Sequence, residues 1–280
     1  MDKVVNHNGE LFFTGEITPS SAVICRLTLT PKDGKYDYEI FTEAGEQTID
    51  PILAVEEKNN EILFEAEEKT YVYEAGKKFS IKPPIPDLLI KQSEIAHHYE
   101  FMFTPPQADI ELLKKYRPEM IQPNIEPDYK FESKTGPAVQ FGDKVWFGVD
   151  FYDGEGVTAV GGYGIYDTSS QTFDMHYEPE LAEWAASAIL VDSDKICLGL
   201  YGQSEGPGAC GGLFCKYFKT QTSKVFDIPY NINAIKQYGD TLVLATANGI
   251  YLIKNAKITA ATFSVNEQGK YQLDFKNISQ

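Results

Sequence analysis

The chain has 280 residues, of which 42% are hydrophobic and 13% aromatic, and 41 acidic against 25 basic side chains give a formal net charge of −16. This composition supplies a sizeable apolar core, which excludes a disordered chain and a small disulfide-stapled fold. The negative charge repels phosphate backbones and anionic lipids, so we expect no nucleic-acid partner and no membrane partner. The acidic side chains are expected to keep the surface soluble, or to attract a cationic partner or Ca²⁺.

The N-terminal residues 1–8 lack the apolar segment of a secretory signal, and no apolar run approaches the ~18 residues of a membrane span. We therefore expect the chain as given to be cytoplasmic, although a signal trimmed from a longer sequence would leave the same pattern. None of the four cysteines forms a CxxC pair. Two of them, Cys197 and Cys215, lie in apolar strand-like runs, where we expect each to behave as a small buried hydrophobe. No neighbouring histidines complete a metal site.

One pattern recurs along the chain. A small residue and an aliphatic residue precede a polar turn rich in Gly, Asp and Asn, and a β-rich strand follows, which is typical of two strands joined by a tight turn. The clear copies are residues 53–66, 137–148, 187–199 and 233–245. With one copy near Val4 and a degenerate copy near Ala96, the starts lie roughly 46 residues apart.

A repeat of this length is typical of a propeller blade of four short strands. We therefore predict an all-β protein, a single β-propeller domain over residues 1–280 with six blades. In three of the four clear copies the second strand closes on Gly or Ala. A small residue at that position permits close packing of neighbouring backbones.

The third predicted copy is irregular. It contains too many prolines for four uninterrupted strands, at positions 83, 84, 86, 105, 106, 118, 123 and 127. Within it, residues 108–116 have apolar side chains at helical spacing, with Asp109 as the N-cap and Pro118 beyond the end. We expect a blade with a short helical insertion near residues 108–117. If this segment is a linker instead, the number of blades falls to five.

In the last three copies a glycine turn leads into an apolar and aromatic third strand, at residues 161–167, 211–217 and 248–253. Together with the preceding Trp146-Phe147-Gly148 and Leu244-Ala245-Thr246, these segments resemble the blades of two-component-regulator-type propellers. The resemblance covers about half the chain. It implies a propeller that binds a ligand or partner, and it does not imply one particular activity. The chain has no histidine-kinase or DNA-binding portion, so no signalling role follows from it.

Two adjacent copies carry extended loops between their second and third strands. The loops share the form Glu-Gly-x-x-Ala-x-Gly-Gly, at residues 155–162 and 205–212. Loops of one type project from the same face of a propeller, so we expect the two glutamates on neighbouring blades. The predicted ligand-binding residues at this face are Tyr152, Asp153, Glu155, Tyr201, Glu205 and Trp184. Trp184 lies between the two copies, either in a small helix that docks on the barrel or as an exposed aromatic that stacks on a ligand.

An acidic and aromatic face suits a sugar, a cation or a basic peptide, and a carboxylate pair could also act as acid and base in glycoside cleavage. The structural alternative is that Glu-Gly is turn chemistry kept by blade duplication. No GxGxxG, P-loop, GxSxG or HExxH sequence is present, and we assign no catalytic residue, metal ligand or cofactor. The sequence predicts a non-enzymatic module that binds a protein, peptide or glycan. The alternative is a glycosidase-like hydrolase or lyase that uses carboxylates at the channel mouth.

Overall fold

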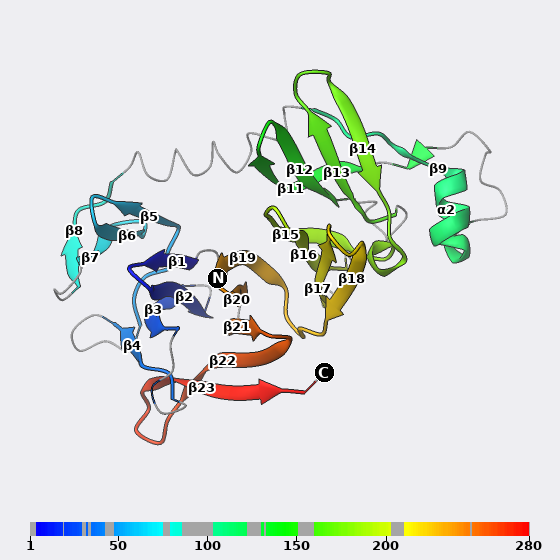
Figure 1. The fold of residues 1–280 in the computed structure, drawn as a ribbon. Coiled ribbons are helices and arrows are strands. Elements are labelled where there is room, and N and C mark those ends of the chain that lie inside the picture. Colours follow the sequence, from blue (N-terminus) through cyan, green and yellow to red (C-terminus); the bar gives the residue numbers. More distant parts are fainter. Residues whose placement is uncertain are drawn as a thin grey trace. The chain divides into compact units, whose positions relative to one another are not determined.

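The computed structural model describes residues 4–18, 20–29, 32, 35–42, 48–74, 79–85, 103–121, 130–131, 133–150, 160–202, 210–246 and 248–279. Over these ranges the chain is mostly β-strand, with one α-helix and two short 3-10 helices (Figure 1). None of the helices in the described ranges has the length and apolar character needed to span a bilayer. The chain forms two compact units, Met1–Ala96 with Lys236–Ser279 and His97–Ile235, which are described separately.

Five antiparallel sheets contain most of the strands, and in each sheet the strands pair in chain order. Sheet 1 contains β1 (Val4–His7), β2 (Glu10–Thr18), β3 (Ser21–Thr28) and β4 (Tyr38–Phe41). Sheet 2 contains β5 (Ala54–Lys58), β6 (Glu61–Glu65), β7 (Thr70–Glu74) and β8 (Ser80–Lys82). Sheet 3 contains β11 (Lys134–Phe141), β12 (Lys144–Asp150), β13 (Tyr163–Asp167) and β14 (Thr172–His176).

Sheet 4 contains β15 (Ala185–Val191), β16 (Lys195–Tyr201), β17 (Cys210–Tyr217) and β18 (Thr222–Phe226). Sheet 5 contains β19 (Ile232–Tyr238), β20 (Thr241–Thr246), β21 (Gly249–Lys254), β22 (Lys257–Val265) and β23 (Tyr271–Ile278). The predicted all-β class is therefore confirmed. The first strands of the five sheets contain the repeat anchors Val4, Ala54, Ala138, Ala188 and Ala234.

The third predicted copy differs from the other five. Its anchor, Ala96, lies outside the described residues, and the described residues between 83 and 133 form only two strands, β9 (Ala108–Asp109) and β10 (Lys130–Phe131). The expected helix is confirmed as α2 (Ile110–Tyr116), which is followed by the 3-10 helix η1 (Pro118–Met120). As expected, Asp109 is its N-cap, and the carboxylate accepts a hydrogen bond from the Leu112 N–H at 2.9 Å.

Sheet 1 is packed on both of its faces. On one face the ring of Phe12 lies 4.4 Å from that of Tyr73 in sheet 2. The next residue along β2, Phe13, points to the other face, because side chains alternate along a strand, and its ring lies 5.9 Å from that of Phe263 in sheet 5. The same Phe263 ring lies so close to Gly15 that a Cβ there would stand 2.3 Å from it. The first sheet of the chain therefore packs against both the second sheet and the last.

Sheets 3 and 4 pack in the same manner. Near the end of β12, a side chain at Gly148 would place its Cβ 2.3 Å from the Cβ of Ala186 in β15. At the matching position of β16, a Cβ at Gly199 would stand 2.8 Å from the Cβ of Ile232, the first residue of β19. The other face of β12 buries Phe147 against α2 and the β9–β10 pair. In β12 and β16 the small residue near the end of the second strand thus allows close approach of the following strand, as expected.

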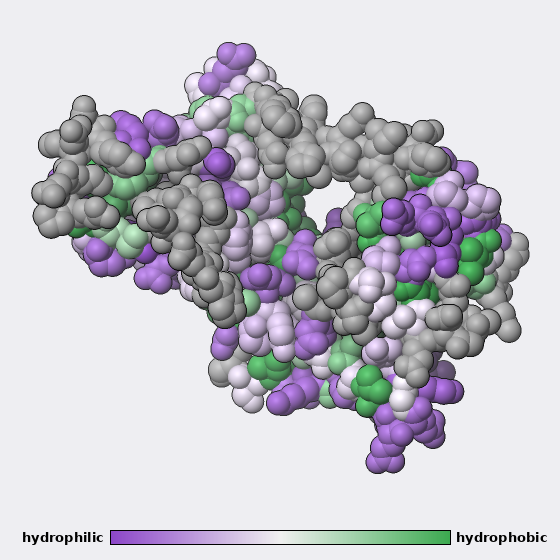
Figure 2. All heavy atoms as spheres, turned by 180° about the vertical axis from the view of Figure 1, so that it is seen from behind, coloured by the Kyte–Doolittle hydropathy of each residue, from purple (hydrophilic) through white to green (hydrophobic). Residues whose placement is uncertain are grey.

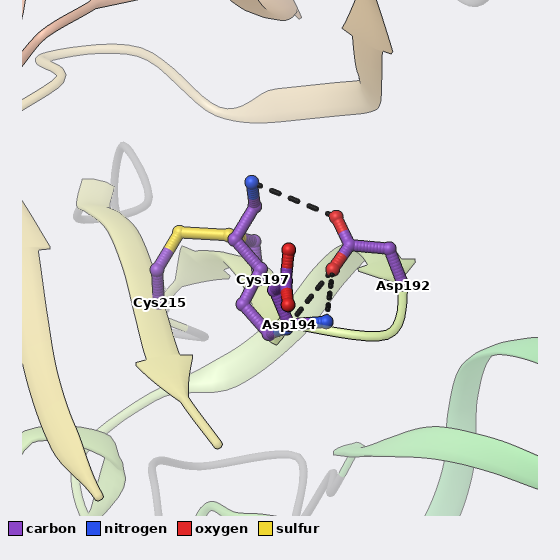
Figure 3. Close-up of a disulfide and its surroundings, with 5 residues drawn as sticks. Asp192, Asp194, Cys197 and Cys215 are labelled. Carbon is purple, nitrogen blue, oxygen red and sulfur yellow. Dashed lines mark hydrogen bonds and ion pairs between the residues drawn. A yellow bond between two sulfur atoms is a disulfide. The ribbon is translucent and has the colours of Figure 1, made fainter. Parts of the chain in front are cut away.

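Two cysteines in sheet 4 form a disulfide, so the expectation that both are unpaired buried thiols is wrong. Cys197 of β16 and Cys215 of β17 are direct partners in the strand register, and their Cα atoms are 4.1 Å apart. This spacing is that of the closer, non-hydrogen-bonded type of antiparallel pair. Figure 3 shows the bond near the turn into β16, where the Asp192 carboxylate accepts the N–H groups of Asp194 and Lys195 at 2.8 and 2.9 Å.

Two glycines with positive φ, one crowded by a neighbouring strand and one not, give a matched test of the close packing in sheet 4. Gly212 and Gly239 both have positive φ, but a Cβ at Gly212 would stand 2.2 Å from the Phe226 carbonyl oxygen, whereas nothing lies within 4 Å at Gly239. Either glycine-to-alanine change costs about 1 kcal/mol for the left-handed backbone. We expect Gly212→Ala to lower the free energy of unfolding by a further ~1–3 kcal/mol. Urea unfolding of both variants measures the difference, and equal midpoints would contradict this packing.

The disulfide predicts a specific pattern of thiol reactivity. In the native, unreduced protein, iodoacetamide should label Cys210, which is partly exposed, and leave Cys25 unlabelled, because burial both shields that thiol and raises its pKa. Peptide mapping should recover Cys197 and Cys215 as one linked pair. The double change to alanine should lower the free energy of unfolding by about 3 kcal/mol. Four free thiols in the denatured, unreduced chain would refute the pairing.

Candidate functional site

The two Glu-Gly loops begin at neighbouring points of sheets 3 and 4. The first loop follows β12, which ends at Asp150, and the second follows β16, which ends at Tyr201. The Tyr201 hydroxyl donates a hydrogen bond to the Asp150 carboxylate at 2.9 Å. Because this bond joins the ends of corresponding strands in adjacent sheets, the bases of the two loops lie side by side. We call this region the loop edge and define it by Asp150, Tyr201 and Trp184.

The remaining predicted site residues are in the loops themselves. Tyr152, Asp153, Glu155 and Glu205 lie outside the described residues. Their grouping around a ligand stays a prediction. The distances between the carboxyl groups of Asp153, Glu155 and Glu205, which would distinguish a glycosidase from a binding module, are likewise outside the described part of the chain.

Trp184 lies in the connection from sheet 3 to sheet 4. It follows the 3-10 helix η2 (Pro179–Leu181), whose Leu181 is buried, so a short helical turn does dock on the sheets here. The indole is half-buried and lies over Gly211, where a Cβ would stand 2.6 Å from the ring. One face of the ring is therefore covered by the strand that leaves the second loop. Stacking of a ligand on the uncovered part stays a prediction.

The Gly-Gly half of the shared loop motif has a packing function. The Gly161 N–H donates to the carbonyl of Ala182 at 3.3 Å, and a Cβ at this glycine would stand 1.9 Å from the Trp184 carbonyl oxygen. At Gly162 a Cβ would stand 2.5 Å from the His176 carbonyl oxygen. These contacts account for the two closing glycines of the first loop and leave the glutamate of the motif as its candidate for ligand contact.

Two buried polar side chains elsewhere, Glu65 and Tyr163, have structural roles. Glu65 is fully buried, and its carboxylate accepts hydrogen bonds from the Thr70 hydroxyl and, at 2.7 Å, from the Ile85 N–H. Tyr163 stacks between Trp146 and His176, with ring centroids 6.4 and 4.7 Å apart. Burial, and to a lesser extent the nearby acidic side chains, raise the pKa of this tyrosine to about 12, so it stays a neutral core residue.

The exposed hydrophobic side chains of the described residues lie in separate elements. The large ones are Leu53, Ile81, Phe141, Val225 and Val265, and no two belong to the same strand. Figure 2 shows one face on which hydrophilic residues predominate and the hydrophobic groups are small and separate. Within the described ranges no three His, Cys, Asp or Glu side chains gather as a metal site would require. The loop edge is therefore distinguished by polar and aromatic side chains, and not by an apolar patch.

Comparison with known proteins gives distant structural likeness alone. No protein-family model matches the chain, and no curated protein sequence does. PorZ, a surface component of the type-IX secretion system of Porphyromonas gingivalis, is 9% identical over 98% of this chain and 39% of its own, with a TM-score of 0.34. The extracellular domain of a putative hybrid two-component system from B. thetaiotaomicron is 11% identical over 97% of this chain and 30% of its own, with a TM-score of 0.33.

YjhT is 9% identical over 97% of this chain and 96% of its own, with a TM-score of 0.42. The chain thus spans less than half the length of the first two proteins and nearly all of the third. Similarities with such low TM-scores and identities do not support any inference about function. The functional argument therefore depends on the loop edge itself.

Proposed function

We propose that the chain is a non-enzymatic binding module that recognises a protein, peptide or glycan through the loop edge and the two loops that start there. The observation that carries the proposal is the Tyr201–Asp150 hydrogen bond between the ends of β16 and β12. It supports a common site, since loops of matching sequence begin side by side on adjacent sheets.

The side chains at this edge define the ligand chemistry. Carboxylates at Asp153, Glu155 and Glu205 would accept hydrogen bonds from sugar hydroxyls or from the cationic side chains of a peptide. Aromatic rings at Tyr152 and Trp184 would stack on a sugar ring or on a guanidinium group. A polyanionic partner is disfavoured, because the chain carries a net charge of −16.

We further propose that the sheets close into one six-bladed propeller over residues 1–280. In one unit the order of packing is last sheet, first sheet, second sheet, and in the other it is the β9–α2–β10 segment, sheet 3, sheet 4. Contact between the first and last sheets of the chain is what a closed ring requires, and it supports this arrangement. Five blades remain the alternative if the segment around α2 is not a blade.

The disulfide also bears on the cellular compartment. The sequence predicts a cytoplasmic location, which stays a prediction. The Cys197–Cys215 disulfide argues against it, because disulfides persist in oxidising compartments and are rare in the cytoplasm.

The proposal is tested with a glycan array and an immobilised library of basic peptides, using the intact chain. Replacement of both glutamates, Glu155→Gln with Glu205→Gln, should weaken binding to the best probe about tenfold or more while leaving the melting temperature unchanged. The matched control is Glu111→Gln with Glu267→Gln, at exposed positions of α2 and the β22–β23 turn.

Two results would contradict the proposal. A large fall in melting temperature in the Glu155/Glu205 variant would show that these residues are structural. Release of reducing ends from an array glycan, abolished by Glu205→Gln, would show a glycosidase instead of a binding module.

A further inference from the structure

A pocket of about 350 Å³ lies between the outer strands of sheets 1 and 5, within a single compact unit. Its volume lies in the range of small-molecule sites. The strands β4 and β23 lie side by side here (Figure 1). The lining residues come from β4, the turn before it, β22 and β23, and they are Lys35, Tyr36, Tyr38, Thr259, Phe275 and Asn277.

The strand registers direct these side chains into one space. In sheet 1, Tyr38 pairs with Leu27, and Tyr36, two residues earlier, also lines the pocket. In sheet 5, Asn277 pairs with Thr259, and Phe275 lies two residues before Asn277 on the same face of β23. Sheets 1 and 5 also contact each other through the rings of Phe13 and Phe263. The pocket lies at the outer end of this contact between the two sheets.

Aromatic rings form the apolar wall of the pocket. Tyr36 and Phe275 stack with ring centroids 4.9 Å apart and an interplanar angle of 14°, and Tyr38 lies tilted at 5.9 Å from Phe275. All three rings are only half-buried, unlike the fully buried rings of Phe12, Phe13 and Phe64 in the same unit. Each ring therefore keeps part of its apolar surface accessible at the pocket.

The polar groups of the pocket are mostly hydrogen-bond donors. The Thr259 hydroxyl donates to the Asn277 side-chain oxygen at 3.0 Å, which leaves the amide N–H groups of Asn277 to donate to a ligand. Lys35 adds an exposed ammonium group, and the two tyrosines add phenolic hydroxyls. Among the described lining residues there is no carboxylate, in a chain whose net charge is −16. The described lining therefore carries one positive charge and no negative one.

From the rings and the donors together, we infer that this pocket binds a monosaccharide unit that carries a carboxylate, that is, a uronic-acid type of sugar. The C–H face of the pyranose ring packs on the Tyr36–Phe275 pair, the carboxylate pairs with the Lys35 ammonium, and a ring hydroxyl accepts a hydrogen bond from Asn277. The site is made of different residues from the loop edge. It stands independently of the function proposed for that edge.

The test is an NMR titration of the intact, isotope-labelled chain with glucuronate and, separately, with glucose. Glucuronate should bind with a Kd on the order of 1 mM and shift the resonances of the lining residues, and glucose should bind about tenfold more weakly. Lys35→Met should reduce glucuronate binding to the level of glucose. The matched control Lys32→Met, an exposed lysine near the pocket but outside its lining, should leave both affinities unchanged.

A second variant tests the aromatic wall. Phe275→Leu should weaken the binding of glucuronate and of glucose by the same factor. If Phe275→Leu fails to fold, the exposed Lys35→Met variant still tests the inference. The inference is overturned if the two sugars bind equally, if Lys35→Met binds glucuronate as the wild type does, or if neither sugar shifts the lining residues.

Discussion

Packing of a second strand between two neighbours is the main constraint within each compact unit: β2 lies between sheets 2 and 5, and β12 lies between sheet 4 and the α2 segment. Because side chains alternate along a strand, Phe12 contacts Tyr73 in sheet 2 and Phe13 contacts Phe263 in sheet 5. In the ring that we propose, sheet 2 follows sheet 1 and sheet 5 precedes it. Such a strand must be apolar at every position, as in the runs Val145–Val149 and Ile196–Leu200. It must also be small where the next first strand approaches, which Gly148 and Gly199 provide. The hydrophobic effect and close packing thus impose the same sequence pattern on β12 and β16.

The sequence predicts those features that depend on residues close together in the chain. The anchors of five sheets, the helix capped by Asp109 and the small residues closing the second strands all have local signals. The Cys197–Cys215 pair could not be found in this way, since strand register and not spacing brings the two sulfurs together. The Tyr201–Asp150 bond and the pocket at Phe275 likewise depend on contacts between sheets, which a single sequence does not specify.

The two proposed sites have opposite chemistry. The loop edge places acidic loops on the ends of β12 and β16, so its ligand should offer donors or positive charge. The pocket between β4 and β23 offers a lysine and an amide donor instead, so its ligand should carry acceptors and negative charge. In both cases paired strands of the sheets position the side chains that we propose as ligand contacts. Loss of one site should therefore leave the other intact.

Small-angle X-ray scattering tests closure of the sheets into one propeller most directly. A compact single domain of this length should have a radius of gyration of about 19 Å and a pair-distance distribution with one maximum. That result would agree with sheets packed in sequence around one ring. A clearly larger radius with two maxima would contradict the account, because it would show two separate bodies joined by the chain.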